Sequence, residues 1–247
     1  PYSRRGLSVI NRGPAITTGN ALTAGVAFAT TQRLAYRQGL SFADANVAVI
    51  GARGSVGMLM ARLCARQRPR HLLLVGNPQT GVTHLQRLRD ELSWGDGTIT
   101  VTTDLGALVP SQIIITATGA GRPVLDEVPL TVGTLICDVA RPYDTSLRLR
   151  SRSDLTVIDG GLVSLPDPTT CFGPGNLQGL PDGIQLACLA ETMLLALEGD
   201  TRNHGIGDAV PLTEVDEMMA LAQRHGFGLA PLPGDGGGAT GGERGER

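Results

Sequence analysis

A glycine-rich turn between an apolar run and a helix-like stretch constrains the fold of this chain more than any other feature. The segment Asn46–Gly51 (NVAVIG) has the unbroken apolar centre of a strand that is buried on both faces. Gly51, Gly54 and Gly57 are spaced as GxxGxxG, and apolar residues then recur at helical intervals up to Arg68. A strand that turns into a helix on three glycines is typical of the first unit of a nucleotide-binding sheet.

Further short apolar runs alternate with helix-like stretches along the next hundred residues. Continuous apolar strands separated by helical segments indicate a parallel sheet that is covered on both faces. The sequence therefore predicts an α/β fold, with a Rossmann-like doubly wound parallel sheet flanked by helices of a second, incomplete lobe. The predicted strands are 46–51, 71–75, 98–103, 112–118, 134–139 and 155–159, with helices at 54–68 and 82–92.

The segments outside the sheet predict helices that pack together as the second lobe. One helix covers 17–38, with Thr18 or Asn20 as its N-cap and Gly39 at its end. Two more cover 183–198 and 212–225. The expected division is 1–43 for the end of a substrate lobe and a linking helix, 44–165 for the NAD(P)-binding domain, 166–232 for a loop and helices that return to the substrate lobe, and 233–247 for a disordered Gly-rich tail.

The composition narrows the chemistry, because all 21 basic residues are arginine and the chain contains no lysine. Pyridoxal and other Schiff-base enzymes need a lysine amine, and a P-loop needs its lysine on the phosphates. A net charge of −2 argues against nucleic-acid binding. The four cysteines have no CxxC pairing and no histidine at ligand spacing, so we expect no metal site. No window has the roughly 20 apolar residues of a membrane span, and free thiols in apolar runs suit the cytoplasm.

The glycine turn lets the backbone approach a pyrophosphate, whose charge then lies at the N-terminus of the helix. The second strand ends at Gly76-Asn77, without the carboxylate that binds the ribose 2′-hydroxyl in NAD enzymes. Arg53, inside the turn, can bind a 2′-phosphate instead, so the sequence favours NADP(H). The predicted cofactor-binding residues lie in the turn, after the second strand and at the end of the fourth strand, and they are Gly51, Arg53, Gly54, Ser55, Val56, Gly57, Asn77, Thr116, Ala117 and Thr118.

Cys188 is one of two candidate reactive thiols. It lies in the predicted helix 183–198, for which Asp182 and Gln185 would form a capping box. Cys188 is then in the second turn, with Glu191 one turn later on the same face. The residues alone favour a small buried hydrophobic role for Cys188 over that of a nucleophile. Cys171, in a Gly/Pro-rich loop, is the alternative thiol on grounds of exposure.

Four segments resemble the cyanobacterial long-chain acyl-[acyl-carrier-protein] reductase family, whose members form fatty aldehydes. The TTGN and ACxAE motifs within them are the specific ones. The family's N-terminal substrate-binding part has no counterpart in these 247 residues, the family's arginine after the second strand is Gly76 here, and the loop 166–181 differs. The four segments are Ile16–Ala24 (ITTGNALTA), Val47–Gly57 (VAVIGARGSVG), Ala187–Leu195 (ACLAETMLL) and Arg224–Phe227 (RHGF).

The resemblance implies a two-stage reaction. Cys188 would take an acyl group from a thioester, and NADPH would then reduce the enzyme thioester to an aldehyde. The resemblance also places Thr18 and Asn20 near the reacting carbonyl, with Glu191 beside Cys188 as a further catalytic residue. The implied partner is an acyl carrier protein or another acyl-thioester donor, and an oligomer is compatible with this function.

An acyl carrier protein is acidic, so a basic docking surface is expected. Two arginine clusters, one at 148–152 and one at 62–70, are candidates. Two other functions stay open. The first is a dehydrogenase of the shikimate or amino-acid kind, which acts without an acyl-enzyme. The second is a non-catalytic NADP-binding module in which Cys188 belongs to the core.

Overall fold

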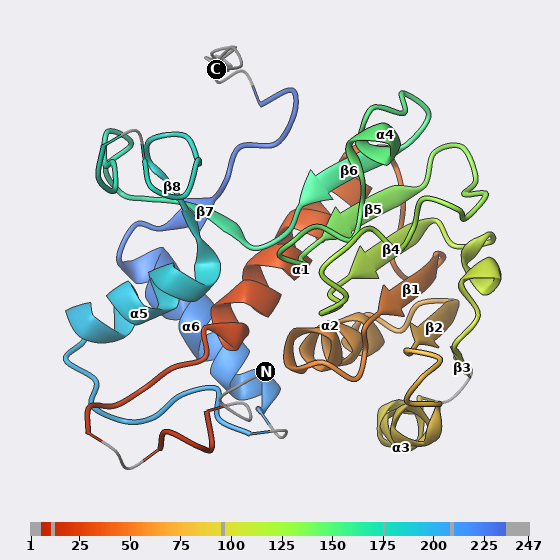
Figure 1. The fold of residues 1–247 in the computed structure, drawn as a ribbon, viewed down its shortest axis with the longest axis horizontal. Coiled ribbons are helices and arrows are strands. Elements are labelled where there is room, and N and C mark those ends of the chain that lie inside the picture. Colours follow the sequence, from red (N-terminus) through yellow and green to blue (C-terminus); the bar gives the residue numbers. More distant parts are fainter. Residues whose placement is uncertain (1–5, 11–12, 95–96, 175, 208–209, 236–247) are drawn as a thin grey trace.

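A six-stranded parallel sheet lies on one side of the computed structural model, which describes residues 6–10, 13–94, 97–174, 176–207 and 210–235 (Figure 1). The strand order is β3-β2-β1-β4-β5-β6. This is the strand order of the Rossmann fold. After β1, the next two strands extend the sheet to one side and the last three extend it to the other, so the strand order reverses between β1 and β4. The predicted fold class is confirmed. The strands are β1 (Asn46–Ile50), β2 (His71–Val75), β3 (Thr98–Thr102), β4 (Ile113–Thr116), β5 (Leu135–Asp138) and β6 (Thr156–Asp159).

The two faces of the sheet are covered differently. Alternate residues of a strand point to opposite faces, so Val49 and Ile115 join the larger part of the core, and Ile50 and Ile114 join the smaller part. The larger part lies under helices, which include α2 (Ser55–Arg66) and α3 (Thr83–Leu92). The smaller part is covered by short elements: the 3-10 helix η1 (Leu105–Leu108), the one-turn helix α4 (Leu147–Arg150) and the segment 124–130.

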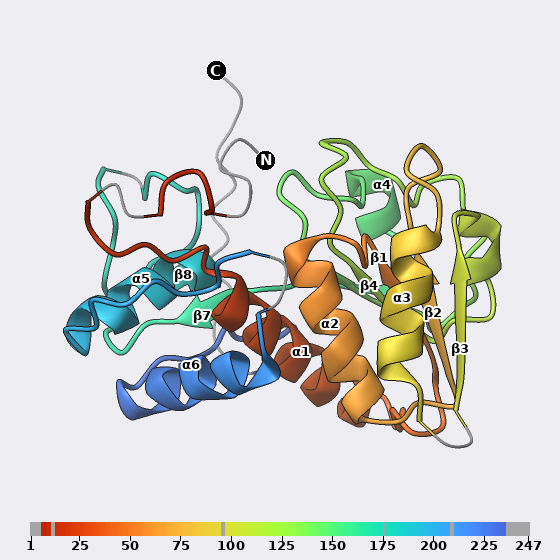
Figure 2. The same ribbon diagram turned by 90° about the horizontal axis from the view of Figure 1, so that it is seen from below.

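Helix α1 (Asn20–Arg37) connects the sheet to the remaining helices. It contacts α2 on one side and α5 (Ala187–Leu197) and α6 (Leu212–Arg224) on the other (Figure 2). Gly25 permits this close packing, because an added Cβ would lie 2.6 Å from the Cγ of Met219 on α6. Helix α1 therefore holds α5 and α6 against the side of the Rossmann unit that α2 covers.

The start of α5 differs from the prediction. The predicted helix 183–198 begins only at Ala187, because Ile184–Leu186 forms strand β8, which pairs antiparallel with β7 (Leu162–Ser164). Gly183 has φ +71°, and an added Cβ would lie 2.6 Å from Cα of Pro168. This left-handed, closely packed residue cannot belong to a helix, so the capping box of Asp182 and Gln185 was a wrong prediction.

The start of α1 was also placed wrongly. The N-cap of α1 is Gly19 in the left-handed conformation (φ 69°), and no side chain caps the helix. Thr17 and Thr18 precede the helix, and Thr17 forms an isolated parallel bridge with His204. The predicted end is confirmed, because Gly39 (φ +69°) follows the last turn.

A three-stranded sheet in the order β8-β7-β9 (β9, Gly228–Leu229) was not predicted, because its strands are only two or three residues long. Of the predicted tail 233–247, residues 236–247 lie outside the described residues. Asp235 is held in place, since its carboxylate pairs with Arg33 and Arg37 of α1 and accepts a hydrogen bond from the N–H of Leu232 (2.7 Å).

Candidate functional site

The glycine turn forms a tight junction between β1, α2 and the end of β4. Gly51 has φ +77°, and an added Cβ would lie 2.5 Å from the carbonyl oxygen of Ala117. At Gly57, an added Cβ would lie 2.7 Å from the carbonyl carbon of Gly51. Side chains at these positions would push the loop away from the helix. The predicted turn is therefore in place at the point where strand order reverses.

The N-terminus of α2 is arranged to receive an anion. Gly54 is its N-cap in an extended conformation, and no side chain caps the helix. The N–H groups of Ser55, Val56 and Gly57 thus lie in the first turn, where backbone donors and the helix dipole favour a phosphate. The residues present fit a dinucleotide pyrophosphate, since Gly51, Gly54 and Gly57 allow the close turn that places these N–H groups at the carboxyl end of β1.

The loop after β2 carries no acidic side chain that could bind a ribose 2′-hydroxyl. Asn77 Oδ1 accepts from the N–H of Gln79 (2.8 Å), and the Asn77 carbonyl accepts from the N–H and the hydroxyl of Thr80 (3.0 and 3.2 Å). Arg53 is exposed in the glycine turn. Thr80 was not singled out from the sequence, and only its position shortly after the second strand could have suggested it.

The loop at the end of β4 is held by a buried carboxylate that sequence analysis missed. Asp144 is fully buried, and it accepts hydrogen bonds from the hydroxyls of Thr116 and Thr118 and from the N–H of Thr118 (2.9 Å). These bonds fix the predicted cofactor segment Thr116-Ala117-Thr118 beside Gly51, which packs against Ala117. Asp144 therefore positions the loop that lies next to the glycine turn.

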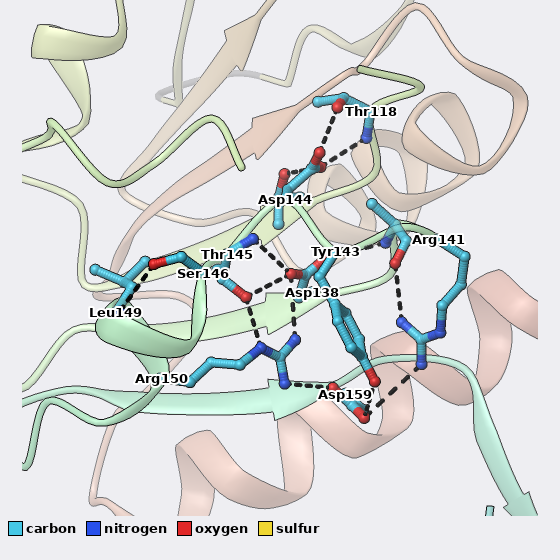
Figure 3. Close-up of polar contacts among 12 residues, drawn as sticks. Thr118, Asp138, Arg141, Tyr143, Asp144, Thr145, Ser146, Leu149, Arg150 and Asp159 are labelled. Carbon is cyan, nitrogen blue, oxygen red and sulfur yellow. Dashed lines mark hydrogen bonds and ion pairs between the residues drawn. The ribbon is translucent and has the colours of Figure 1, made fainter. Parts of the chain in front are cut away.

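A second carboxylate network lies next to Asp144, at the ends of β5 and β6 (Figure 3). Asp138 and Asp159, the last residues of these strands, are bridged by Arg150, whose Nη2 and Nη1 lie 3.2 and 2.6 Å from their oxygens. Burial opposes the charge on Arg150, but the hydrogen bond to Asp159 and the two negative charges outweigh it and raise its pKa. Tyr143 lies between Arg150 and Arg141, each of which stacks on its ring, and burial raises the pKa of its hydroxyl.

This network changes the interpretation of the arginines at 148–152. Arg150 is bound between Asp138 and Asp159, and Arg152 pairs with Asp154 (2.7 Å). In the other cluster, Arg66 lies 3.1 Å from Asp216. Neither cluster presents a continuous surface of unpaired positive charge.

Cys188 is the second residue of α5, one turn earlier than predicted. The N–H of the preceding Ala187 donates to the carbonyl of Gly161 (2.8 Å), two residues beyond the end of β6. This bond ties the start of α5 to the carboxyl edge of the sheet. Cys188 is half-buried there, whereas Cys64 and Cys137 are buried and Cys171 is exposed on its loop.

The TTGN segment packs directly on Cys188. Gly19 (φ +69°) faces it so closely that an added Cβ would lie 2.5 Å from Cα of Cys188. The Thr17 hydroxyl accepts from the N–H of Gly19 (3.0 Å), and the Thr18 hydroxyl donates to the carbonyl of Gly205 (2.8 Å). Asn20 is the first residue of α1 and is half-buried. The structure thus brings together Thr18, Asn20 and Cys188, three of the predicted catalytic residues.

Glu191, the fourth, is buried against the start of α1. Its carboxylate accepts from the Thr17 hydroxyl and from the N–H of Leu22 (2.7 Å), and its side chain is 0% exposed. Burial raises the pKa of Glu191, and the hydrogen bonds from Leu22 and Thr17 oppose this shift. The carboxylate therefore connects α5 to α1 and holds Gly19 on Cys188.

Several groups act on the Cys188 thiol. Burial raises its pKa, whereas the backbone N–H groups of Leu189 and of Cys188 itself favour the thiolate, as expected for a helix N-terminus. The charge of Glu191 raises the pKa further, and that of Arg141 lowers it. In contrast, burial raises the pKa of Cys137 to about 12, which makes that thiol inert.

Two histidines next to α6 pair with carboxylates, and one of them lies beside the TTGN segment. His204 is buried next to Thr17 and Thr18, between the carboxylates of Asp200 and Glu214 (3.2 and 3.5 Å), whereas His225 pairs with Glu198 at the surface.

Within the ranges that the structure describes, no three His, Cys, Asp or Glu side chains are grouped so that they could hold a metal ion. None of the described helices is long and apolar enough to cross a membrane.

The chain is similar in sequence to known proteins over most of its length. No family model matches the chain. Aminotransferase PigE from Serratia sp. is 30% identical over 93% of this chain. Long-chain acyl-[acyl-carrier-protein] reductase from Synechococcus elongatus is 28% identical over 85% of this chain. The chain spans only 27% and 61% of the length of these two relatives.

Solved structures also align with the chain. Glutamyl-tRNA reductase from Methanopyrus kandleri is 24% identical, with a TM-score of 0.42 over 60% of this chain and 35% of its own. Shikimate 5-dehydrogenase from Listeria monocytogenes, in complex with shikimate and NAD, is 15% identical, with a TM-score of 0.43 over 56% of this chain and 52% of its own. The strand order, the glycine turn and the uncapped helix of the present structure make its central unit an NAD(P)-binding Rossmann domain.

Proposed function

We propose that this chain reduces an acyl thioester to an aldehyde with NADPH, through an acyl group carried by Cys188. One observation carries the proposal: the first turn of α5 attaches Cys188 to the carboxyl edge of the dinucleotide-binding sheet, and the TTGN turn packs against it. In open α/β sheets, ligands bind outside the carboxyl ends of the strands. The similarity to a long-chain acyl-[acyl-carrier-protein] reductase supports the same chemistry.

In the first step, the Cys188 thiolate attacks the carbonyl carbon of the donor thioester. A carbon–sulfur bond forms, the carbonyl π pair moves to oxygen, and the pair returns as the carrier thiolate leaves. NADPH supplies the hydride for the second step, in which two electrons add to the same carbon and the bond to Cys188 breaks. The products are an aldehyde, NADP⁺ and the regenerated Cys188 thiolate. The transfer keeps the acyl group as a thioester, which is a better hydride acceptor than the carboxylate that hydrolysis would give.

We assign different roles to the residues around Cys188. Asn20 lies beside Gly19 at the start of α1, and its amide would orient the acyl carbonyl. Thr18, whose hydroxyl is engaged with Gly205, would hold the turn in place together with Glu191. Because the Glu191 carboxylate is buried and hydrogen-bonded, we propose that it is a positioning residue and not a proton donor.

We propose NADP(H) over NAD(H) because Arg53, Asn77 and Thr80 offer no negative charge where a 2′-phosphate would lie. Replacing Arg53 with Gln should lower affinity for NADPH about tenfold and leave NADH affinity within twofold. Exposed Arg122, which follows the β4 loop, is the control: Arg122→Gln should leave both affinities unchanged. Equal losses for the two cofactors in Arg53→Gln would contradict the assignment.

The similarity to an aminotransferase does not indicate amino transfer by these residues. Pyridoxal enzymes hold their cofactor on a lysine, and the sequence has none. The matched part covers 27% of that relative, so the other 73% lies outside the match. We propose that an acyl carrier protein, or another acyl-thioester donor, supplies the substrate.

The test is transfer of a labelled acyl group. The protein is incubated with a radiolabelled acyl-carrier-protein thioester without NADPH, and label is sought on Cys188 by peptide mapping. We expect label in the unaltered protein and in Cys171→Ser, none in Cys188→Ala, and release of labelled aldehyde when NADPH is added.

Two results would overturn the proposal. NADPH binding without label on Cys188 would indicate a non-catalytic module. NADPH oxidation that persists in Cys188→Ala with a ketone or imine substrate would indicate a dehydrogenase that acts without an acyl-enzyme.

A further inference from the structure

Arg141 is a cation at the carboxyl edge of the sheet that the reaction described above does not use. It follows β5 by three residues. Its Nη1 donates to the carbonyl of Ala140 (2.9 Å), and its guanidinium lies 4.4 Å from the centre of the Tyr143 ring (Figure 3). The side chain is therefore held in one place, and 33% of it is exposed.

The charge of Arg141 is only loosely balanced within the network. Asp159 accepts short hydrogen bonds from Arg150 (2.6 Å) and from the Tyr143 hydroxyl (2.8 Å), one on each carboxylate oxygen. Arg141 reaches Asp159 only at 3.9 Å, beyond hydrogen-bonding distance. Arg150, in contrast, makes close contacts with both Asp138 and Asp159. The network thus holds Arg141 in position without a short bond to a carboxylate, so its guanidinium N–H groups can donate to another acceptor.

The fold places Arg141 and Cys188 at two adjacent strand ends. Asp138 and Asp159 are paired in the β5–β6 register, and the N–H of Gly160 donates to the Asp138 carbonyl (2.8 Å). Gly161 then accepts the bond from Ala187 that anchors α5. The electrostatic effect agrees with this placement, since the charge of Arg141 favours the thiolate form of Cys188 and lowers its pKa.

We propose that Arg141 is a catalytic residue that binds the carbonyl oxygen of the acyl group on Cys188 and stabilises the negative charge that develops on it. This inference rests on the proposed acyl-thioester function. The oxygen gains its charge twice, when the thiolate attacks the donor and when the hydride adds, and it loses the charge each time a carbon–sulfur bond breaks. A guanidinium is always protonated, so it supplies this stabilisation without a proton transfer.

The test compares an anionic with a neutral reagent on the same thiol. Iodoacetate and iodoacetamide both alkylate the thiolate, so the ratio of their rates reports the charge near Cys188 and not the amount of thiolate. The measurement is made on the Cys188 peptide in a Cys171→Ser background, because Cys171 is exposed. We expect Arg141→Gln to lower the ratio of the iodoacetate rate to the iodoacetamide rate about three- to tenfold. Arg141→Lys should retain most of it, and the exposed Arg148→Gln should not change it.

Turnover provides the second measurement. Arg141→Gln should lower kcat about 100-fold or more, as loss of an oxyanion donor does elsewhere. The pH profile of iodoacetamide alkylation should shift upward in this variant. Among the residues that the structure describes, Glu191 on the same helix is the other charge that acts on Cys188, and the TTGN turn packed against Cys188 contributes no charged side chain. An unchanged reagent ratio in folded Arg141→Gln would overturn the inference even where Cys188 accepts the acyl label. If Arg141→Gln changes the ratio but Cys188 accepts no acyl label, the proposed function is refuted, whereas the positive charge of Arg141 near Cys188 is supported.

Discussion

Glu191 allows the link between α1 and α5 to be measured as a pH-dependent stability. Its carboxyl group is buried, and burial raises its pKa above the value in the unfolded chain, about 4.3. The folded protein therefore binds more protons at this site than the unfolded chain does. The contribution of Glu191 to stability is fully present below the unfolded pKa and is lost as the pH rises through the folded pKa. Each unit of difference between the two values corresponds to about 1.4 kcal/mol.

Replacement of Glu191 with Gln removes the titration but keeps the contacts. The amide oxygen can accept from the N–H of Leu22, and the amide nitrogen can donate to the Thr17 hydroxyl. The free energy of unfolding of the unaltered protein, relative to Glu191→Gln, should therefore decrease between pH 4 and pH 7. Glu191→Ala, which also lacks the titrating group, should be less stable than Glu191→Gln by about 3–5 kcal/mol at every pH, because the buried Leu22 N–H loses its partner and a cavity remains.

Urea unfolding followed by circular dichroism at several pH values measures these differences. Glu217→Gln is the control, since Glu217 is exposed on α6 and its replacement should leave the pH dependence unchanged. If the unaltered protein instead gains stability relative to Glu191→Gln as the pH rises, the bonds from Thr17 and Leu22 outweigh burial. The argument that Glu191 is desolvated would then be refuted.

The remaining predictions concern backbone contacts and the cofactor loop. Gly19→Ala should destabilise the protein by more than about 2 kcal/mol and slow alkylation of Cys188, because its Cβ would overlap Cys188. Gly39→Ala is the control, because Gly39 also has φ +69° but has open space around it; thermal unfolding should show only the strain of a left-handed residue, about 1 kcal/mol. Equal losses of stability in the two variants would mean that the contact of Gly19 with Cys188 is unimportant. Asp144→Ala should weaken NADPH binding about tenfold in a fluorescence titration, because Thr116 and Thr118 lose their anchor, and unchanged affinity would show that this loop does not contact the cofactor.

The sheet could be predicted from the sequence because its central strands are buried on both faces. Residues 72–75 of β2 and 113–115 of β4 are therefore continuous apolar runs, and their short length distinguishes them from buried helices. The start of α5 could not be predicted in this way. Ile184–Leu186 continues into the apolar helix, and what separates strand from helix is its pairing with β7 and the contact between Gly183 and Pro168. That contact joins residues 15 positions apart, so no local pattern records it.

The carboxylate network shows a related limit. Asp138 and Asp159 end adjacent parallel strands, so their proximity follows once the strand order is known. Arg150, however, alternates with Arg148 and Arg152 in a pattern that equally suits a solvated surface. Its position between the two carboxylates depends on α4 turning back over the sheet, and the Ser146 side chain caps this short helix by accepting from the N–H of Leu149. A charge pattern that is ambiguous along the chain thus acquires a defined partner only through tertiary structure.

The correction at α5 alters the chemical argument for Cys188. In a second turn the helix dipole has little effect on a thiol, whereas at the second residue of the helix the backbone N–H groups of Cys188 and Leu189 themselves favour the thiolate. Burial outweighs them, so the pKa of Cys188 is raised above that of a free thiol. The charge of Arg141 opposes this shift from a different strand end, and the loop that carries it is fixed by Asp138 and Asp144. For the proposed role of Cys188, we therefore expect the anchoring of α5 to the sheet at Gly161 to matter as much as the residues next to Cys188 in the sequence.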